Sequence, residues 1–193
     1  MKIFSYLYDK TIQWSATRRA PFYLAGVAFA ESSFFPIPPD VMLISMGLAL
    51  PKKSWYFAAI TTLFSVLGGL FGYAIGHYFM ETIRPFLETS SYGGLFKQIE
   101  LWFRHYGTII VFVAAFSPFP YKLFTIAAGG LSVPLFPFVL GSFLGRGGRF
   151  FLISTLMYYS GHKLHGQLKR YIEGLGYFFL LIIVLIFLYK WFR

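Results

Sequence analysis

Long apolar segments alternate with short polar ones along the chain, and several are long enough to cross a lipid bilayer. A helix needs about 20 apolar residues in a row to span the hydrocarbon core. Residues 55–80 and 134–161 meet this length, and residues 174–189 form a shorter, uniformly apolar segment. The pattern predicts an all-α integral membrane protein.

One polar stretch interrupts the first apolar segment, residues 20–50. It begins at Glu31, ends at Asp40 and reads ESSFFPIPPD. Proline removes a backbone donor, and a charge is costly in hydrocarbon, so such a stretch is expected where protein or a water-filled cavity surrounds it. We therefore predict a re-entrant hairpin, in which two half-helices enter and leave on the same side of the membrane. The prolines of its tip are Pro36, Pro38 and Pro39.

A second apolar segment, residues 107–131, carries a similar interruption, SPFPYK, and then runs into AAGG. Sliding the first unit by 82 positions aligns Pro36 with Pro118, Pro38 with Pro120, Asp40 with Lys122 and Gly47 with Gly129. In both units a long apolar span follows the hairpin. The sequence therefore predicts an internal repeat of two re-entrant helical hairpins, each followed by a transmembrane helix.

The repeat has a consequence for topology. A hairpin plus one span makes a single net crossing, so the second unit begins on the opposite face, and the two halves are inverted as in many transporters. The two tips then approach the midplane from opposite sides. Asp40 and Lys122 are expected to face each other across one cavity, where opposite charges lower each other's cost of burial.

Four glycines in the first span fall near spacings of four residues. Small residues allow a neighbouring helix to approach closely. Plain helix packing is the interpretation that we favour for them. They are Gly68, Gly69, Gly72 and Gly76.

Two arginines, Arg146 and Arg149, lie well inside the second span. Because they are three positions apart, they share one face of a helix. Arginine presents a planar fork that suits phosphate or carboxylate. We favour a role in binding a substrate over two alternatives, namely that they neutralise Glu31 and Asp40 or that they extend to the membrane surface.

The chain is interpreted as a single membrane domain, residues 1–193. An apolar stripe with charged edges predicts an amphipathic N-terminal helix at the membrane surface. The mixed composition after the first span predicts a surface segment that ends in an amphipathic helix near residues 95–105. The parts are therefore residues 1–19, the N-terminal helix; 20–80, the first hairpin and span; 81–106, the surface segment; 107–161, the second hairpin and span; and 171–193, a C-terminal transmembrane helix.

Composition narrows the classes of function. The chain is 57% hydrophobic and 12% charged, whereas soluble domains carry about 25% charged residues. Its net charge of +10 does not indicate nucleic-acid binding, because the basic residues cluster at the ends of apolar segments. With no cysteine and 4 scattered histidines, neither a metal site nor a cofactor is expected. Nine Lys and Arg on one predicted side against five on the other favour a cytoplasmic N-terminus.

These motifs together resemble the DedA family, also called the SNARE-associated Golgi or VTT-domain group. The likeness rests on Glu31 and Asp40 around the first proline tip, on the span ending GYAIGHYF and on the second hairpin. It implies a bacterial inner-membrane protein that moves lipids between leaflets. Members are linked to recycling of undecaprenyl phosphate, to phospholipid flipping or scrambling, and to the proton gradient.

The second hairpin departs from the family pattern, which places arginines on both sides of its proline. Here Ser117 stands at the first of these positions, and Lys122 lies one position before the second. Arg146 and Arg149 stand where many members have a small polar residue and a tryptophan. The chain therefore resembles the divergent YqaA-like branch, in which the basic charge has moved to the following helix.

The sequence supports a lipid transporter in which Lys122, Arg146 and Arg149 hold an anionic phosphate headgroup. Glu31 and Asp40 would take and release protons, since burial disfavours a charged carboxylate. A proton-coupled carrier of a small soluble ion or osmolyte, and a scaffold whose charges only fix the hairpins, stay open as alternatives, as does a homo-oligomer. No catalytic motif is present, so an enzyme is the least favoured class.

Overall fold

The computed structural model describes residues 10, 13–15, 17–33, 38–89, 93–117 and 120–160. All regular structure within these ranges is helical, which confirms the all-α prediction. The predicted C-terminal span, residues 171–193, and most of the predicted N-terminal helix, residues 1–19, lie outside the described part of the chain. The same holds for two of the predicted tip prolines, Pro36 and Pro118.

The first predicted hairpin corresponds to two helices, α2 (Ala20–Ser33) and α3 (Asp40–Ala49). Pro38 and Pro39 directly precede α3, and the carbonyl of Pro39 accepts the first bond of that helix from the Leu43 amide at 2.8 Å. Proline is tolerated there because the first amides of a helix have no partner within it. A short 3₁₀ turn, η1 (Pro51–Lys53), connects the hairpin to the next helix.

The longest described helix is α4 (Ser54–Thr89), with 36 residues. Within the described residues, the stretch Pro51–Thr82 is the one that is long and apolar enough to cross a membrane. The helix continues beyond the predicted end at residue 80, and Pro85 lies inside it. The segment predicted to lie at the surface from residue 81 therefore begins as a continuation of this helix.

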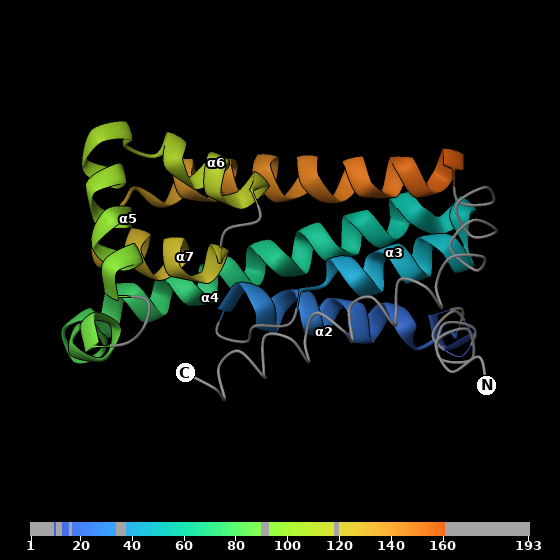
Figure 1. Ribbon diagram of the computed structural model, residues 1–193, viewed down its shortest axis with the longest axis horizontal. Coiled ribbons are helices and arrows are strands. Elements are labelled where there is room, and N and C mark those ends of the chain that lie inside the picture. Colours follow the sequence, from blue (N-terminus) through green and yellow to red (C-terminus); the bar gives the residue numbers. More distant parts are fainter. Residues whose placement is uncertain are drawn as a thin grey trace, which may run out of the picture.

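Helix α5 (Gly93–Tyr106) is the predicted amphipathic helix. It buries Phe96, Ile99 and Phe103, which the helical repeat places on one face. Gly107 ends it with a positive φ of 59°, a conformation that glycine adopts without strain. In Figure 1 this helix runs across one end of the molecule, roughly perpendicular to the long helices.

The second predicted hairpin corresponds to α6 (Ile109–Phe116) and α7 (Tyr121–Gly130), and α7 begins directly after Pro120. A long helix follows and is described over residues 135–160. The order of elements is thus the same in both halves of the chain. Each has a helix, a break that contains proline, a helix of 10 residues and a short connection to a long helix.

The two hairpins lie at opposite ends of the molecule (Figure 1). Helices α2 and α3 occupy the end where α4 begins, and α6 and α7 occupy the end where α5 lies. Helix α4 and the helix over residues 135–160 extend along the full length beside both hairpins. Both hairpins therefore reverse direction near the middle of the molecule.

Glycines of α4 allow both hairpins to approach its backbone. A Cβ on Gly68 would overlap the Phe29 carbonyl oxygen of α2, and a Cβ on Gly76 would overlap the Ile126 carbonyl oxygen of α7. Side chains complete the core in two apolar clusters, one around Phe57 and Phe150 and the other around Phe124. The predicted packing role of the glycine positions is confirmed.

Candidate functional site

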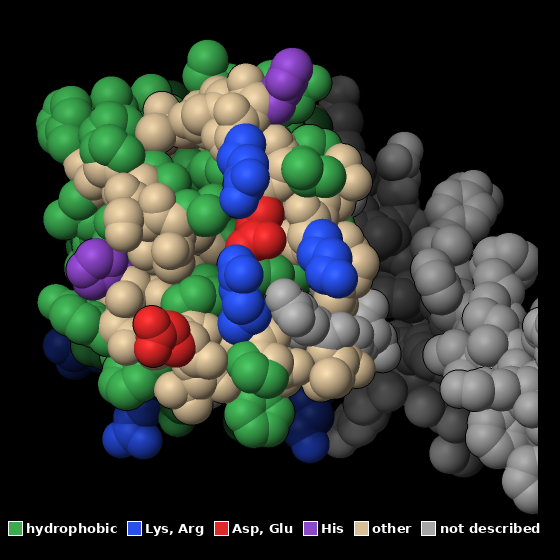
Figure 2. All heavy atoms as spheres, turned by 90° about the vertical axis from the view of Figure 1, so that its left-hand side faces the viewer, with side chains coloured by type: hydrophobic (Ala, Val, Ile, Leu, Met, Phe, Trp, Pro, Cys, Tyr) green, Lys and Arg blue, Asp and Glu red, His purple; other side chains and the backbone are tan. Residues whose placement is uncertain are grey.

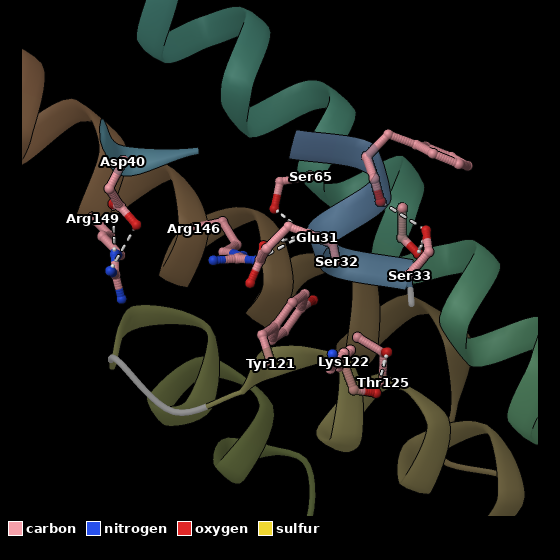
Figure 3. A network of polar contacts seen from close by, with 12 residues as sticks. Glu31, Ser32, Ser33, Asp40, Ser65, Tyr121, Lys122, Thr125, Arg146 and Arg149 are labelled. Carbon is pink, nitrogen blue, oxygen red and sulfur yellow. Dashed lines mark hydrogen bonds and ion pairs between the residues drawn. The ribbon is translucent and has the colours of Figure 1, made fainter. Parts of the chain in front are cut away.

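An ion pair between Arg146 and Glu31 lies where the first hairpin meets the long helix over residues 135–160. The Arg146 side chain is only 3% exposed and that of Glu31 is 16% exposed. One guanidinium nitrogen, Nη2, donates to Glu31 Oε2 and to Ser32 Oγ, the latter at 2.8 Å (Figure 3). Ser32 Oγ also lies 2.7 Å from Ser65 Oγ of α4. The polar contacts thus join three helices.

Aromatic rings enclose the same guanidinium. Its Cζ lies 4.5 Å from the centre of the Tyr121 ring and 5.4 Å from that of Phe150. Such contacts stabilise a cation most where water is excluded, by about 2 kcal/mol. Tyr121 is fixed by its hydroxyl, which donates to Ser142 Oγ at 2.5 Å. Arg146 therefore contacts both hairpins, through Glu31 in the first and Tyr121 in the second.

A second ion pair joins Arg149 to Asp40, the first residue of α3. Nε donates to Oδ1 at 3.2 Å and Nη2 to Oδ2 at 3.0 Å, so the carboxylate is bound by two parallel hydrogen bonds. The remaining nitrogen, Nη1, donates to the Ser117 carbonyl oxygen at 2.7 Å. This pair is more accessible, with side chains 23% and 17% exposed.

Local sequence explains the position of both arginines. They lie three residues apart, so both point from one side of the helix toward the hairpins. Gly145 brings this helix close to α6, since a Cβ there would lie 2.6 Å from Ala115 Cβ and 2.7 Å from the Phe112 carbonyl oxygen. That close contact brings Arg149 within reach of the end of α6 at Ser117.

The predicted opposition of Asp40 and Lys122 is not what the structure shows, because the carboxylate of Asp40 is bound by Arg149. In Figure 3, Lys122 lies beside Thr125, on the other side of the Glu31–Arg146 pair from Asp40. Equivalent positions of a repeat need not meet, and here the arginine helix supplies the nearer cation. The observed geometry matches the alternative in which the two arginines neutralise Glu31 and Asp40.

Several polar residues of the network were not among the predicted site residues, namely Ser32, Ser65, Tyr121 and Ser142. Ser32 follows Glu31 directly, and Tyr121 follows Pro120, so proximity to a predicted tip was the available signal. Among the residues that the structure describes, no group of three or more His, Cys, Asp or Glu is placed to hold a metal ion.

Comparison with known proteins gives relatives along nearly the whole chain. A protein of Haemophilus influenzae described as uncharacterized is 44% identical over 177 residues, which cover 92% of each chain. A protein of Histophilus somni, described in the same way, is 42% identical over 188 residues, covering 97% of this chain and 98% of the relative. No solved structure gives a significant match.

The VTT domain family model matches residues 37–159, which include α3, α4, the second hairpin and both arginines. This match covers more than half of the chain and confirms the predicted family. Its members are membrane proteins of a transporter-like kind and are not known as enzymes. The chain therefore belongs to the VTT-domain family, also called the DedA family.

Proposed function

We propose that the protein moves a phosphate-bearing lipid, such as undecaprenyl phosphate or a phospholipid, between the leaflets of the bacterial inner membrane. The observation that carries the proposal is the Glu31–Arg146 pair, a nearly buried arginine held by a carboxylate from the facing hairpin. Ionisable side chains in a membrane-embedded bundle are costly and mark pathways for substrates and protons. Two pairs at one level of this bundle therefore point to such a pathway.

The surface of the long helices supports a location in the membrane. Leu63, Leu67 and Phe71 are spaced by four residues along α4, and all are more than 40% exposed. On the helix over residues 135–160, Leu140 and Leu144 are exposed in the same way. Contiguous exposed apolar side chains of this kind suit contact with lipid. In this arrangement the two hairpins are the inverted re-entrant elements, and the N-terminus lies in the cytoplasm.

The ion pairs offer a mechanism for proton coupling. A phosphate presents oxygens to a guanidinium much as a carboxylate does, so a headgroup would compete with Glu31 for Arg146 and with Asp40 for Arg149. Protonation removes the negative charge of a carboxylate and weakens its hold on the arginine. Proton binding would then free the arginines for the headgroup, and phosphate release would follow as the protons leave. Lys122, close to Tyr121 in α7, would provide a third cation.

The test is a lipid-movement assay in proteoliposomes with fluorescent phosphatidylglycerol and an external quencher. The informative variant is Glu31→Gln with Arg146→Gln, which removes both charges together and leaves no unpaired ion. We expect this variant to move phosphatidylglycerol at least about tenfold more slowly than the wild type, as the loss of one charged contact predicts. The matched control is Arg84→Gln with Glu100→Gln, a pair on α4 and α5 whose arginine is 47% exposed.

Wild-type rates in the folded Glu31→Gln, Arg146→Gln variant would contradict the proposed headgroup site. An imposed proton gradient should accelerate movement in the wild type and not in this variant. If the wild type moves no lipid but takes up a soluble phosphate or osmolyte, the carrier alternative replaces the lipid transporter.

A further inference from the structure

A cavity of about 950 Å³ lies between the first hairpin and the residues before it. We call it the N-terminal groove. It is lined by Lys10, residues 14–15 and residues 17–20 on one side and by parts of α2 and α3 on the other. Its volume is near the upper limit of about 300–1,000 Å³ for small-molecule sites. It is separate from the ion pairs, none of whose residues line it.

The lining changes character along the groove. Arg18 and Arg19 directly precede α2, which begins at one end of the molecule (Figure 1), and they line the groove together with Lys10. Val27, Val41 and Met42 lie farther along the hairpin. Val27 lies eight positions after Arg19, or about 12 Å along α2 at the helical rise of 1.5 Å per residue. The groove is therefore basic at the end of the molecule and apolar toward the middle.

Two aromatic side chains line the groove beside its basic part. The rings of Trp14 and Tyr23 are stacked with centroids 6.5 Å apart, and both residues are exposed. Tryptophan and tyrosine favour the level of lipid headgroups in a membrane. Their position next to Arg18 and Arg19 indicates that this part of the groove lies at the membrane surface.

The charge of the lining indicates the sign of the occupant, because none of the described residues that line the groove is acidic. A second cavity, of about 670 Å³, lies at the opposite end and differs in this respect. It is lined by Glu81, Arg84 and His77, and Figure 2 shows basic and acidic side chains together on that face. Of the two cavities, the N-terminal groove is the one that favours an anion with an apolar body.

We propose that the N-terminal groove binds an anionic phospholipid as a resident ligand. Its headgroup lies against Lys10, Arg18 and Arg19, and an acyl chain lies along Val27, Val41 and Met42. Basic residues near a membrane surface attract anionic lipids, and their contributions add. Such a lipid would link the segment before α2 to the hairpin that carries Glu31 and Asp40. This site is distinct from the one proposed for the transported lipid, and it holds whether or not the protein moves lipids.

The experiment titrates fluorescent phosphatidylglycerol into the full-length protein in a neutral detergent. Arg18→Gln with Arg19→Gln is expected to weaken binding roughly 25-fold, about fivefold for each cation removed. The matched control is Lys52→Gln with Lys53→Gln, two exposed lysines of η1 at the same end of the molecule but outside the groove. The control should change binding less than about threefold, because neither lysine lines the groove and salt screens exposed charges.

A second variant tests the apolar part without changing charge. Ser45 of α3 lines the groove, and Ser45→Phe places a ring in the space assigned to the acyl chain. This variant should bind phosphatidylglycerol at least about tenfold more weakly while it unfolds at the wild-type temperature, since a filled site excludes its ligand. Unchanged affinity in this variant would overturn the proposed position of the chain.

Two further outcomes would also overturn the proposal. Equal weakening by the groove and control variants would show general attraction of an anionic lipid to a basic protein. Competition by glycerol 3-phosphate at the concentrations where phosphatidylglycerol binds would show a site for free phosphate. The expected result is competition by unlabelled phosphatidylglycerol and a much weaker effect of phosphatidylcholine.

Discussion

The two hairpins contact α4 in the same way but differ in charge. Both α2 and α7 press a backbone carbonyl against a glycine of α4, at Gly68 and Gly76. The first hairpin carries Glu31 and Asp40, whereas the segment of the second, residues 107–131, contains no acidic residue. The cations that bind the acids come from the helix after the second hairpin. Packing is therefore common to both halves, and charge is what distinguishes them.

The largest effect is expected from Arg146→Leu, which leaves Glu31 without its cation. Breaking a buried pair from one side costs about 3–5 kcal/mol of unfolding free energy. Thermal unfolding in detergent, followed by circular dichroism, measures the loss. Arg84→Leu is the control, because its exposed pair with Glu100 contributes about 0–1 kcal/mol. Equal losses in the two variants would show that burial does not make the Glu31–Arg146 pair more important for stability than the Arg84–Glu100 pair.

Adding Glu31→Leu to the Arg146→Leu variant sharpens this comparison. Replacing both members of a buried pair by apolar residues is often neutral. We expect the double variant to regain most of the lost stability, since no unpaired charge remains. A double variant as unstable as Arg146→Leu would instead assign the loss to the ring contacts of the guanidinium.

The next largest loss of stability is expected from two glycine variants that test whether both hairpins pack equally closely on α4. Gly68→Ala and Gly76→Ala each place a Cβ against a backbone carbonyl oxygen, which cannot rotate away as a side chain does. Overpacking of this kind costs about 1–3 kcal/mol. Gly26→Ala in α2 is the control, because nothing lies within 4 Å of its Cβ position. Alanine there is expected to raise helix stability by up to about 1 kcal/mol.

The unfolding temperatures of these three alanine variants show whether the two hairpins pack equally on α4. Similar decreases for Gly68→Ala and Gly76→Ala would support equal packing of both hairpins on α4. A decrease at one position alone would mean that the hairpins are not equivalent in packing either.

The smallest of these effects is expected from Arg149→Lys. Lysine keeps the positive charge beside Asp40 but cannot form the paired hydrogen bonds and the contact with the Ser117 carbonyl at once. We expect a loss of about 1–2 kcal/mol in unfolding free energy, in line with one or two charged hydrogen bonds. Arg84→Lys is the control, and chemical denaturation gives both values. A loss as large as that of Arg146→Leu would show that the hydrogen bonds of the Arg149 guanidinium, and not its charge alone, are essential.

Local features of the fold followed from the sequence because they depend on neighbouring residues. The breaks before α3 and α7 were predicted from proline, which cannot continue a helix at those positions. Close packing of α4 was predicted from Gly68 and Gly76, and the amphipathic α5 from its apolar repeat. The extension of α4 to Thr89 was not, since the mixed composition from residue 81 was interpreted as a separate surface segment.

The pairing of charges did not follow from the sequence, because it depends on how distant helices are placed. The spacing of Arg146 and Arg149 predicted a shared face but not the partner of either residue. The repeat aligned Asp40 with Lys122, yet alignment gives equivalence and not contact. Apart from its position after Pro120, nothing in the sequence identified Tyr121, because its role depends on lying beside an arginine 25 positions away.

The distance along the chain between the paired charges has a consequence for biosynthesis. Glu31 and Arg146 are 115 positions apart, and Asp40 and Arg149 are 109 apart. At roughly 5–20 residues per second, the ribosome makes the acids about 5–20 s before the arginines that bind them. During that interval the first hairpin has neither of these partners. Both ion pairs can therefore form only when the helix over residues 135–160 has been made, so the contacts between the two halves of the protein are completed late in synthesis.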